Sequence, residues 1–102
     1  MDDAMTRSET IATLKASAGE IRNLGATGLY LYGSAARDEL TADSDVDVFI
    51  DYDPQSSFSF VELVRLQALI GQKLARDVDL TTRNGLHPLL KAEIESSSIK
   101  VL

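Results

Sequence analysis

The sequence predicts an α+β fold in which helices cover one face of a short mixed β-sheet. Segments with helical spacing of apolar residues alternate with short strand-like segments along the chain. In two of the strand-like segments, aspartates lie on the face opposite the aliphatic residues. Because carboxylates are not buried under a second helical layer without partners, we expect two layers, with the acidic face of the sheet left open for a ligand.

Composition limits both the size and the partners of the protein. The chain has 102 residues, of which 44% are hydrophobic, and this suits a single domain over residues 1–102. It contains no cysteine, no apolar run of the roughly 20 residues needed to span a membrane, and no signal-like core in its N-terminal stretch MDDAMTRSET. We therefore expect a cytoplasmic protein without membrane contact. A net charge of −6 argues against direct binding of nucleic acid.

The first half of the chain reads as helix, strand, short helix and strand. Thr6 and Glu9 have the spacing of a capping box, and apolar residues at helical intervals predict one helix up to Gly25. A strand follows over 27–32, bounded by Gly28 and Gly33. We expect a short helix at 35–37 and a second strand over 45–52.

The second half continues with helix, strand and helix. Ser59 and Glu62 form another capping-box pair, and one apolar face predicts a helix to about Ala75. A third strand is expected over 77–82. His87 and Pro88 should begin a last helix that runs to about residue 96, and residues 99–102 form a short strand or a packed tail.

The stretch from 29 to 53 carries the candidate site. Gly33-Ser34 follows the first strand, and after ten residues Asp45 and Asp47 begin the second. On a strand these two carboxylates project from one face about 6.6 Å apart, and a cation relieves their repulsion. A glycine lets a phosphate approach the backbone, while a serine hydroxyl and free amides bind it. The pattern predicts a metal-bound phosphate site, although Asp38, Glu39 and Asp43 are more simply a solvated acidic loop.

These residues resemble the signature of the nucleotidyltransferase superfamily related to DNA polymerase beta, Gly-Ser followed after about ten residues by Asp-x-Asp. Ala36-Arg37 and Ser44-Asp45 also fit the minimal nucleotidyltransferases, although position 38 is Asp where relatives commonly carry Gly. The resemblance implies a palm-like two-layer fold and a third carboxylate on a later strand. Asp77 and Asp79 share the required face, and Asp79-Leu80-Thr81 better matches the family pattern.

The resemblance further implies that ATP is the nucleotide donor and that two Mg²⁺ ions are bound, about 3.5–4 Å apart. Asp45 and Asp47 would bind both ions, and Asp79 would complete the one that activates the attacking hydroxyl. Gly33 and Ser34 would hold the phosphates. Arg37 could equally neutralise the triphosphate or form a surface ion pair. The other candidates considered, more simply structural or solvated, are His87, Arg76, Arg83, Tyr30, Tyr32 and Phe49.

A chain of this size is expected to leave the acceptor to a partner. It looks like the antitoxins that pair with a small helical HEPN ribonuclease toxin and transfer AMP to a tyrosine of that toxin. The leading hypothesis is thus an antitoxin that acts as a protein adenylyltransferase on a HEPN-type toxin. Two alternatives remain open: a catalytically inert binding module that neutralises its partner by complex formation, and a small-molecule nucleotidyltransferase completed by homodimerisation.

Overall fold

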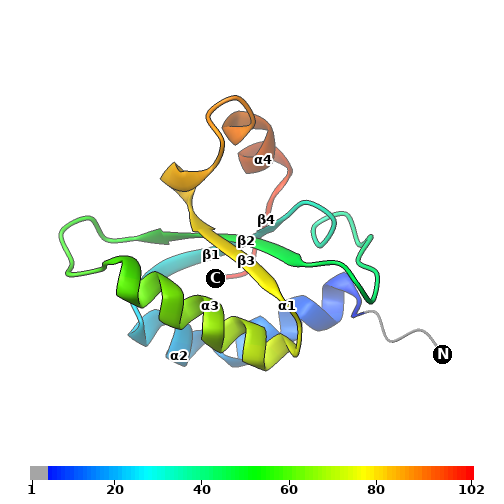
Figure 1. Ribbon diagram of the computed structural model, residues 1–102, viewed down its shortest axis with the longest axis horizontal. Helices are drawn as coiled ribbons and strands as arrows, with labels where there is room; N and C mark the ends of the chain where they lie inside the picture. Colours follow the sequence, from blue (N-terminus) through cyan, green and yellow to red (C-terminus); the bar gives the residue numbers. More distant parts are fainter. Residues whose placement is uncertain (1–4) are drawn as a thin grey trace.

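The computed structural model describes residues 5–102, so the first four residues of the stretch considered for a signal peptide lie outside the described part. Its centre is a four-stranded mixed sheet with the order β3-β2-β1-β4 (Figure 1). The strands are β1 (Ala26–Tyr32), β2 (Val46–Tyr52), β3 (Val78–Thr82) and β4 (Ile99–Lys100). All four predicted strands are present, within one residue of the predicted starts for the first three. No helix within residues 5–102 is long and apolar enough to cross a membrane.

The pairing of the strands brings the start of β2 beside the start of β3. β1 pairs antiparallel with both β2 and β4, whereas β2 and β3 are parallel. Parallel strands need a long crossover connection, which here contains helix α3 (Phe60–Leu74). In the parallel register Asp47 lies opposite Asp79, so their side chains share one face of the sheet.

Helix α3 confirms its sequence signals in detail. Ser59 caps it, and the capping box with Glu62 is present. Leu66, Ile70 and Leu74 are buried against the sheet, as the apolar spacing predicts. The helix ends at Ala75, which adopts the left-handed conformation with φ of 53°.

The first helical region is two helices rather than the single helix expected up to Gly25. α1 (Arg7–Ala16) has the predicted capping box of Thr6 and Glu9, and α2 (Ala18–Asn23) follows after a break at Ser17. The Ser17 amide donates to the Leu14 carbonyl, three residues back, and its hydroxyl donates to the Thr13 carbonyl. These local bonds replace the helical pattern at this position.

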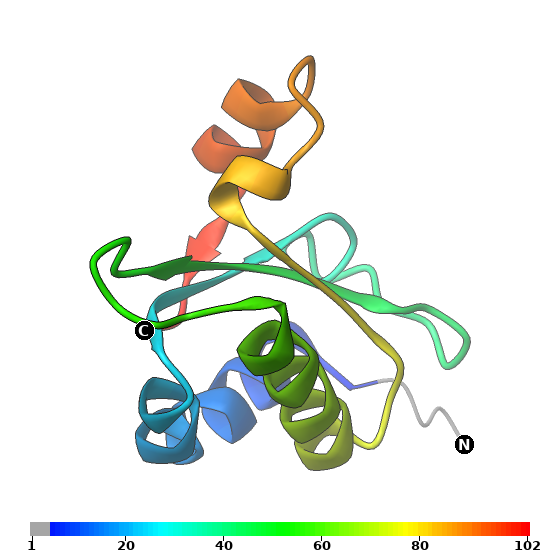
Figure 2. The same cartoon turned by 60° about the vertical axis from the view of Figure 1, so that its left-hand side comes forward.

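Helices α1, α2 and α3 cover one face of the sheet and form the main core with it, as Figures 1 and 2 show from two sides. Aliphatic residues of β1, β2 and β3 point into this layer. The fully buried members of the core include Leu14, Ile21, Leu29, Leu31, Val46, Val48, Ile50, Leu66 and Ile70. The predicted α+β class and its two main layers are therefore confirmed.

The last helix differs from the expectation in its start and its position. It begins at Lys91 rather than at His87 or Pro88, and α4 (Lys91–Ser97) lies on the other side of the sheet from α1 to α3 (Figures 1 and 2). Residues 83–85 form a 3-10 turn, η1 (Arg83–Gly85), and the His87 Nδ1 accepts the Leu89 amide instead of opening a helix. The acidic face is therefore not open along its whole length.

Arg83 fastens this C-terminal segment to the sheet. Its Nε and Nη2 donate to the two carboxylate oxygens of Asp51 at 2.7 and 2.9 Å, and its Nη1 donates to Glu95 of α4 at 2.6 Å. The guanidinium carbon lies 4.9 Å from the ring centroid of Tyr30 and 5.0 Å from that of Phe49. These hydrogen bonds hold the pKa of Asp51 below its ordinary value. Arg83 is thus a structural residue rather than a solvated one.

We expect Arg83→Ala to lower the free energy of unfolding by about 1–2 kcal/mol, because it removes charged hydrogen bonds from partly exposed carboxylates. Urea unfolding measures the loss. The stability contributed by Asp51 is present above its unfolded pKa and lost as pH falls through its lower folded pKa, so the difference from wild type should shrink in acid. Arg22→Ala, at an exposed position, is the control and should change stability by less than about 0.5 kcal/mol. Equal losses in both variants would contradict a structural role for Arg83.

Candidate functional site

The turn after β1 is built against a carboxylate of β2. Gly33 has φ of +65°, and a Cβ added there would lie 2.6 Å from Oδ2 of Asp47. Both the backbone conformation and the lack of space therefore demand glycine at this position. The glycine and the second aspartate of the sequence motif are in direct contact, although fourteen positions separate them along the chain.

Residues 33–39 form a hydrogen-bonded turn and not the short helix expected at 35–37. The Arg37 amide donates to the Gly33 carbonyl at 3.3 Å, and the Glu39 amide donates to the Ser34 carbonyl at 2.8 Å. Asp38 ends the turn with φ of 59°. A left-handed residue stops helix growth, and aspartate tolerates this conformation better than most non-glycine residues.

Asp38 has a further contact that the expectation of a solvated loop missed. Its Oδ1 accepts the backbone amide of Arg7, in the first turn of α1, at 2.7 Å. The Arg7 guanidinium donates in turn to the Ala36 carbonyl at 3.0 Å. An unpaired amide at a helix start favours a carboxylate partner. The turn of residues 33–39 is thereby anchored to the helical layer.

Three aspartates lie toward the open end of the acidic face, and the charges of two of them act on the third. Asp47 is half-buried and lies opposite Asp79 across the parallel pair, while Asp45 immediately precedes β2. Burial raises the pKa of Asp47, and the negative charges of Asp79 and Asp45 raise it further, whereas Arg37 lowers it. Asp77, which precedes β3, is not among the charges acting on Asp47. The structure thus brings Asp79, rather than Asp77, into the electrostatic cluster.

The chemistry of this cluster fits a divalent cation. Carboxylate oxygens are the ligands that Mg²⁺ prefers, and neighbouring carboxylates repel one another less when they share a cation. Within residues 5–102 no three acidic, histidine or cysteine side chains already surround a common point at metal-binding distances. The assignment of Asp45, Asp47 and Asp79 as ligands therefore stays a prediction, supported by their mutual repulsion.

Tyr32 belongs to the same end of the sheet, which the sequence did not reveal. It lies opposite Asp47 in the antiparallel pair, and its ring is 5.8 Å from that of Phe49. Burial and the negative charges of Asp47 and Asp79 raise the pKa of its phenol to about 12. One signal was available, since Tyr32 directly precedes Gly33 on the predicted strand. The phenol remains protonated and offers a hydrogen-bond donor beside the carboxylates.

Arg37 and Ser34 are the remaining predicted site residues of the turn. Arg37 is exposed and pairs with Glu39, so one of its two predicted roles, a surface ion pair, is present. Among residues 5–102 no side-chain hydrogen bond engages the Ser34 hydroxyl.

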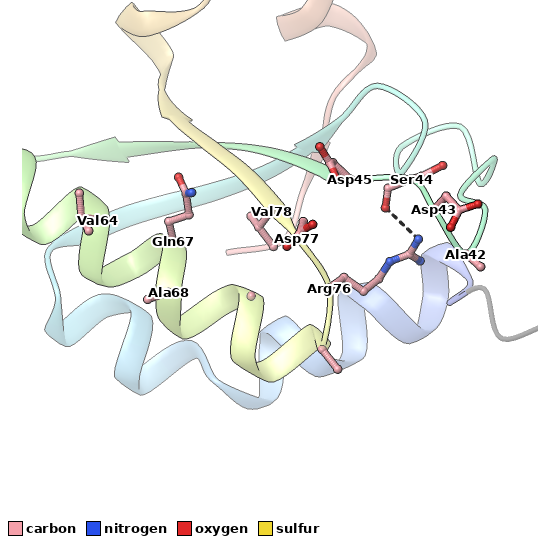
Figure 3. A pocket seen from close by; sticks show the side chains of 12 residues that line it. Ala42, Asp43, Ser44, Asp45, Val64, Gln67, Ala68, Arg76, Asp77 and Val78 are labelled. Carbon is pink, nitrogen blue, oxygen red and sulfur yellow. Dashed lines mark hydrogen bonds between the residues drawn. The ribbon is translucent and has the colours of Figure 1, made fainter.

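Arg76 has a role that the sequence did not suggest. Its Nη2 donates to the Ser44 carbonyl at 2.9 Å, as Figure 3 shows, and also to the Thr41 carbonyl. It therefore fixes the loop that leads into Asp45.

Comparison with known proteins adds to this geometry. The family model described as "Nucleotidyltransferase domain" matches residues 14–101. The chain belongs to this nucleotidyltransferase family. The predicted resemblance and the predicted enzyme class, a nucleotidyltransferase, are therefore confirmed.

Three similar proteins define the relationship. "Putative protein adenylyltransferase MJ0435" of Methanocaldococcus jannaschii is 36% identical over 72 residues, which cover 71% of this chain and 75% of that protein. A solved structure described as a "putative minimal nucleotidyltransferase" matches with a TM-score of 0.81 at 25% identity, covering 93% of this chain and 95% of that one. The structure of a tri-AMPylated Shewanella oneidensis HEPN toxin in complex with MNT antitoxin has a TM-score of 0.62 at 15% identity, covering 90% of this chain and 71% of that one. This last likeness concerns the fold.

We expect Gly33→Ala to lower the free energy of unfolding by about 1–3 kcal/mol, because it imposes a left-handed backbone on alanine and places a methyl group against Asp47. Thermal or urea unfolding measures this loss. Gly19→Ala is the matched control, since a Cβ there meets nothing within 4 Å and the position is helical. It should be neutral or stabilising by about 0.5–1 kcal/mol.

The contact with Asp47 is tested by a double-mutant cycle. In an Asp47→Ala background the cost of Gly33→Ala should fall, because only the backbone strain remains. An unchanged cost would show that the turn does not pack against Asp47.

Proposed function

We propose that this protein transfers AMP from ATP to a hydroxyl group of a partner protein, a tyrosine of a HEPN-type toxin, and thereby acts as an antitoxin. The carrying observation is the position of Asp47, held between the Gly33 turn on one side and Asp79 in register on the other. The contact of the Gly33 turn with Asp47, and the position of Asp79 opposite it, support a phosphate-binding role for the turn next to the aspartates. The name of the Methanocaldococcus jannaschii relative and the AMPylated toxin bound to a protein of the same fold support the acceptor class.

The turn of residues 33–39 serves the nucleotide. The Ser34 hydroxyl and nearby backbone amides bind phosphate oxygens of ATP, and Gly33 allows their close approach. Arg37 is exposed beside the cluster and lowers the pKa of Asp47 through its charge. Its guanidinium can exchange Glu39 for a phosphate oxygen, because exposed ion pairs are weak.

The carboxylates serve the metal and the attacking group. Asp45, Asp47 and Asp79 would hold two Mg²⁺ ions, which supply positive charge to the reacting phosphate and lower the pKa of the acceptor hydroxyl. The acceptor oxygen forms a bond to the α-phosphorus, the bond from that phosphorus to the bridging oxygen breaks, and pyrophosphate leaves. Asp79, exposed at the open end of the sheet, receives the proton of the hydroxyl.

When this protein is incubated with ATP, Mg²⁺ and a HEPN-type protein encoded by an adjacent gene, the HEPN-type protein should gain about 329 Da, the mass of one adenylyl group, for each AMP transferred. Asp47→Asn and Asp79→Asn should reduce the rate by about 10²-fold or more, because each removes a charge that stabilises the transition state. Intact-mass spectrometry and peptide mapping measure the transfer. Asp53→Asn, at an exposed turn position beyond the far end of β2, is the control. An unmodified toxin that is neutralised equally by wild type and Asp47→Asn would contradict catalysis.

Metal binding is tested separately through stability. In buffer with EDTA, Asp47→Asn should be more stable than wild type, since it removes the repulsion from Asp79 and Asp45. Addition of MgCl₂ should raise the melting temperature of wild type. At a free Mg²⁺ concentration ten times the dissociation constant, binding adds about 1.4 kcal/mol to the free energy of unfolding. The rise should be much smaller in Asp47→Asn, with NaCl at equal ionic strength as the reference. Equal stabilisation of both proteins by MgCl₂ would contradict the assignment.

A further inference from the structure

A cavity of about 980 Å³ lies between α3, the start of β3 and the loop of residues 42–45, next to the carboxylate cluster. One wall is α3, the other is the start of β3, and the end is formed by the loop of residues 42–45 (Figure 3). Asp45 is common to the cavity lining and to the cluster around Asp47. Asp47 and Asp79 do not line it, so it is a neighbour of the nucleotide site and not the same space.

The charge of this edge groove is negative. Asp43, Asp45 and Asp77 line it with three carboxylates, and Arg76 is its one basic lining residue among those described. Nη2 of Arg76 donates to the Ser44 and Thr41 carbonyls, whereas its Nη1 is buried without a hydrogen-bond partner among the described residues. The lining therefore carries one positive charge against three negative ones. A polyphosphate would be repelled here, whereas a cationic segment would be attracted. Charge therefore separates the groove from the turn of residues 33–39 that suits the phosphates.

The apolar surface of the groove suits a polypeptide. Val64 and Ala68 of α3 line it opposite Val78 of β3, and Val64 is 50% exposed. The exposed apolar surface continues toward the start of α3 through Val61 and Phe60, which are 55% and 76% exposed. Such a patch beside a charged rim is typical of a protein-binding surface.

The strand at this edge adds a backbone template. β3 is the outermost strand of the sheet, and within residues 5–102 no strand pairs with its outer side. An unpaired edge presents amide and carbonyl groups that can bind an extended peptide as an additional strand. Specificity would come from side chains that alternate between the apolar wall and the carboxylate rim.

We propose that the groove between α3 and the β3 edge binds the acceptor protein through an extended segment in which basic and apolar residues alternate. This inference rests on the proposed function, because it supplies the docking site for the protein that receives AMP. The groove reaches Asp45 from α3 and β3, whereas the turn after β1 lies against Asp47. Donor and acceptor thus reach the carboxylates by separate routes, as in-line attack requires.

The test uses two fluorescent 12-residue peptides, each with a central tyrosine. One alternates lysine and valine, and the other carries glutamate in place of each lysine. In the absence of ATP, fluorescence anisotropy should show binding of the lysine peptide at least about tenfold tighter than of the glutamate peptide, with affinity falling as NaCl increases. Equal affinities, or binding of neither peptide, would overturn the proposal.

Two matched variants locate the binding site. Ala68→Arg places bulk and positive charge in the groove and should weaken lysine-peptide binding at least about tenfold. Ala12→Arg is the same change at an exposed position of α1, outside the groove, and should bind as wild type does. Thermal unfolding verifies that both variants fold. Gln67→Arg, which also places bulk and positive charge at an exposed lining residue of α3, is used if Ala68→Arg does not fold. Unchanged binding by the folded groove variant would overturn the proposal.

Peptide binding without ATP does not depend on catalysis, so the two hypotheses fail in different ways. If AMP transfer to the toxin is abolished by Asp47→Asn but unaffected by Ala68→Arg, the proposed function stands and the groove is not the docking site. If the lysine peptide binds in the groove but no AMP is transferred to any tested acceptor, the groove is supported and the adenylyltransferase activity is not.

Discussion

The repulsion between Asp47 and Asp79 is the constraint on which the site depends. Parallel pairing of β2 with β3 places Asp47 and Asp79 opposite each other on neighbouring strands, and the backbones of such strands lie about 4.8 Å apart. Burial raises the pKa of Asp47, and the negative charge of Asp79 raises it further. Asp47 and Asp79 lie opposite each other, with Asp45 next to β2 and the Gly33 turn against Asp47. This concentration of negative charge suits a positively charged ligand.

The rest of the acidic face shows how the fold limits that cost. Two residues further along the face of β2, Phe49 is fully buried. Its ring stacks on that of Tyr30, and the Arg83 guanidinium lies over it. Asp51 then has the bidentate partner that Asp47 lacks. The pKa of Asp51 is lowered where that of Asp47 is raised, although both carboxylates lie on the same strand and face. Arg83 and α4 therefore divide one predicted acidic face into a structural half and an open half.

The sequence predicted what depends on local pattern. Period-two alternation placed Asp45, Asp47 and Asp79 on one face, and capping boxes located the starts of α1 and α3. It did not predict what depends on contacts between distant residues. The apolar spacing around Ser17 predicts one continuous helix, but the chain breaks into two helices there. The left-handed Asp38 is held by its hydrogen bond from the Arg7 amide. The late start of α4 follows from a turn at His87. The sequence indicated no specific partner for Arg76 or Arg83, because Ser44 and Asp51, to which they donate, lie more than thirty positions away.

Asp45 gains its importance from these long-range contacts. It lies just outside β2, so the strand alone does not fix its side chain. The preceding loop is instead held by Arg76, by the Ser44 amide bonded to the Thr41 carbonyl at 3.1 Å, and by the Val46 amide bonded to the Asp77 carbonyl at 3.0 Å. The bond from Val46 connects β2 to the start of β3, and the bonds of Arg76 and Ser44 close the loop between β1 and β2. A segment bound at the start of β3 would therefore touch the same residues. The loop that orients Asp45 is therefore the structural element shared by the carboxylate cluster and the groove, and any acceptor that docks there acts directly on the geometry of the cluster.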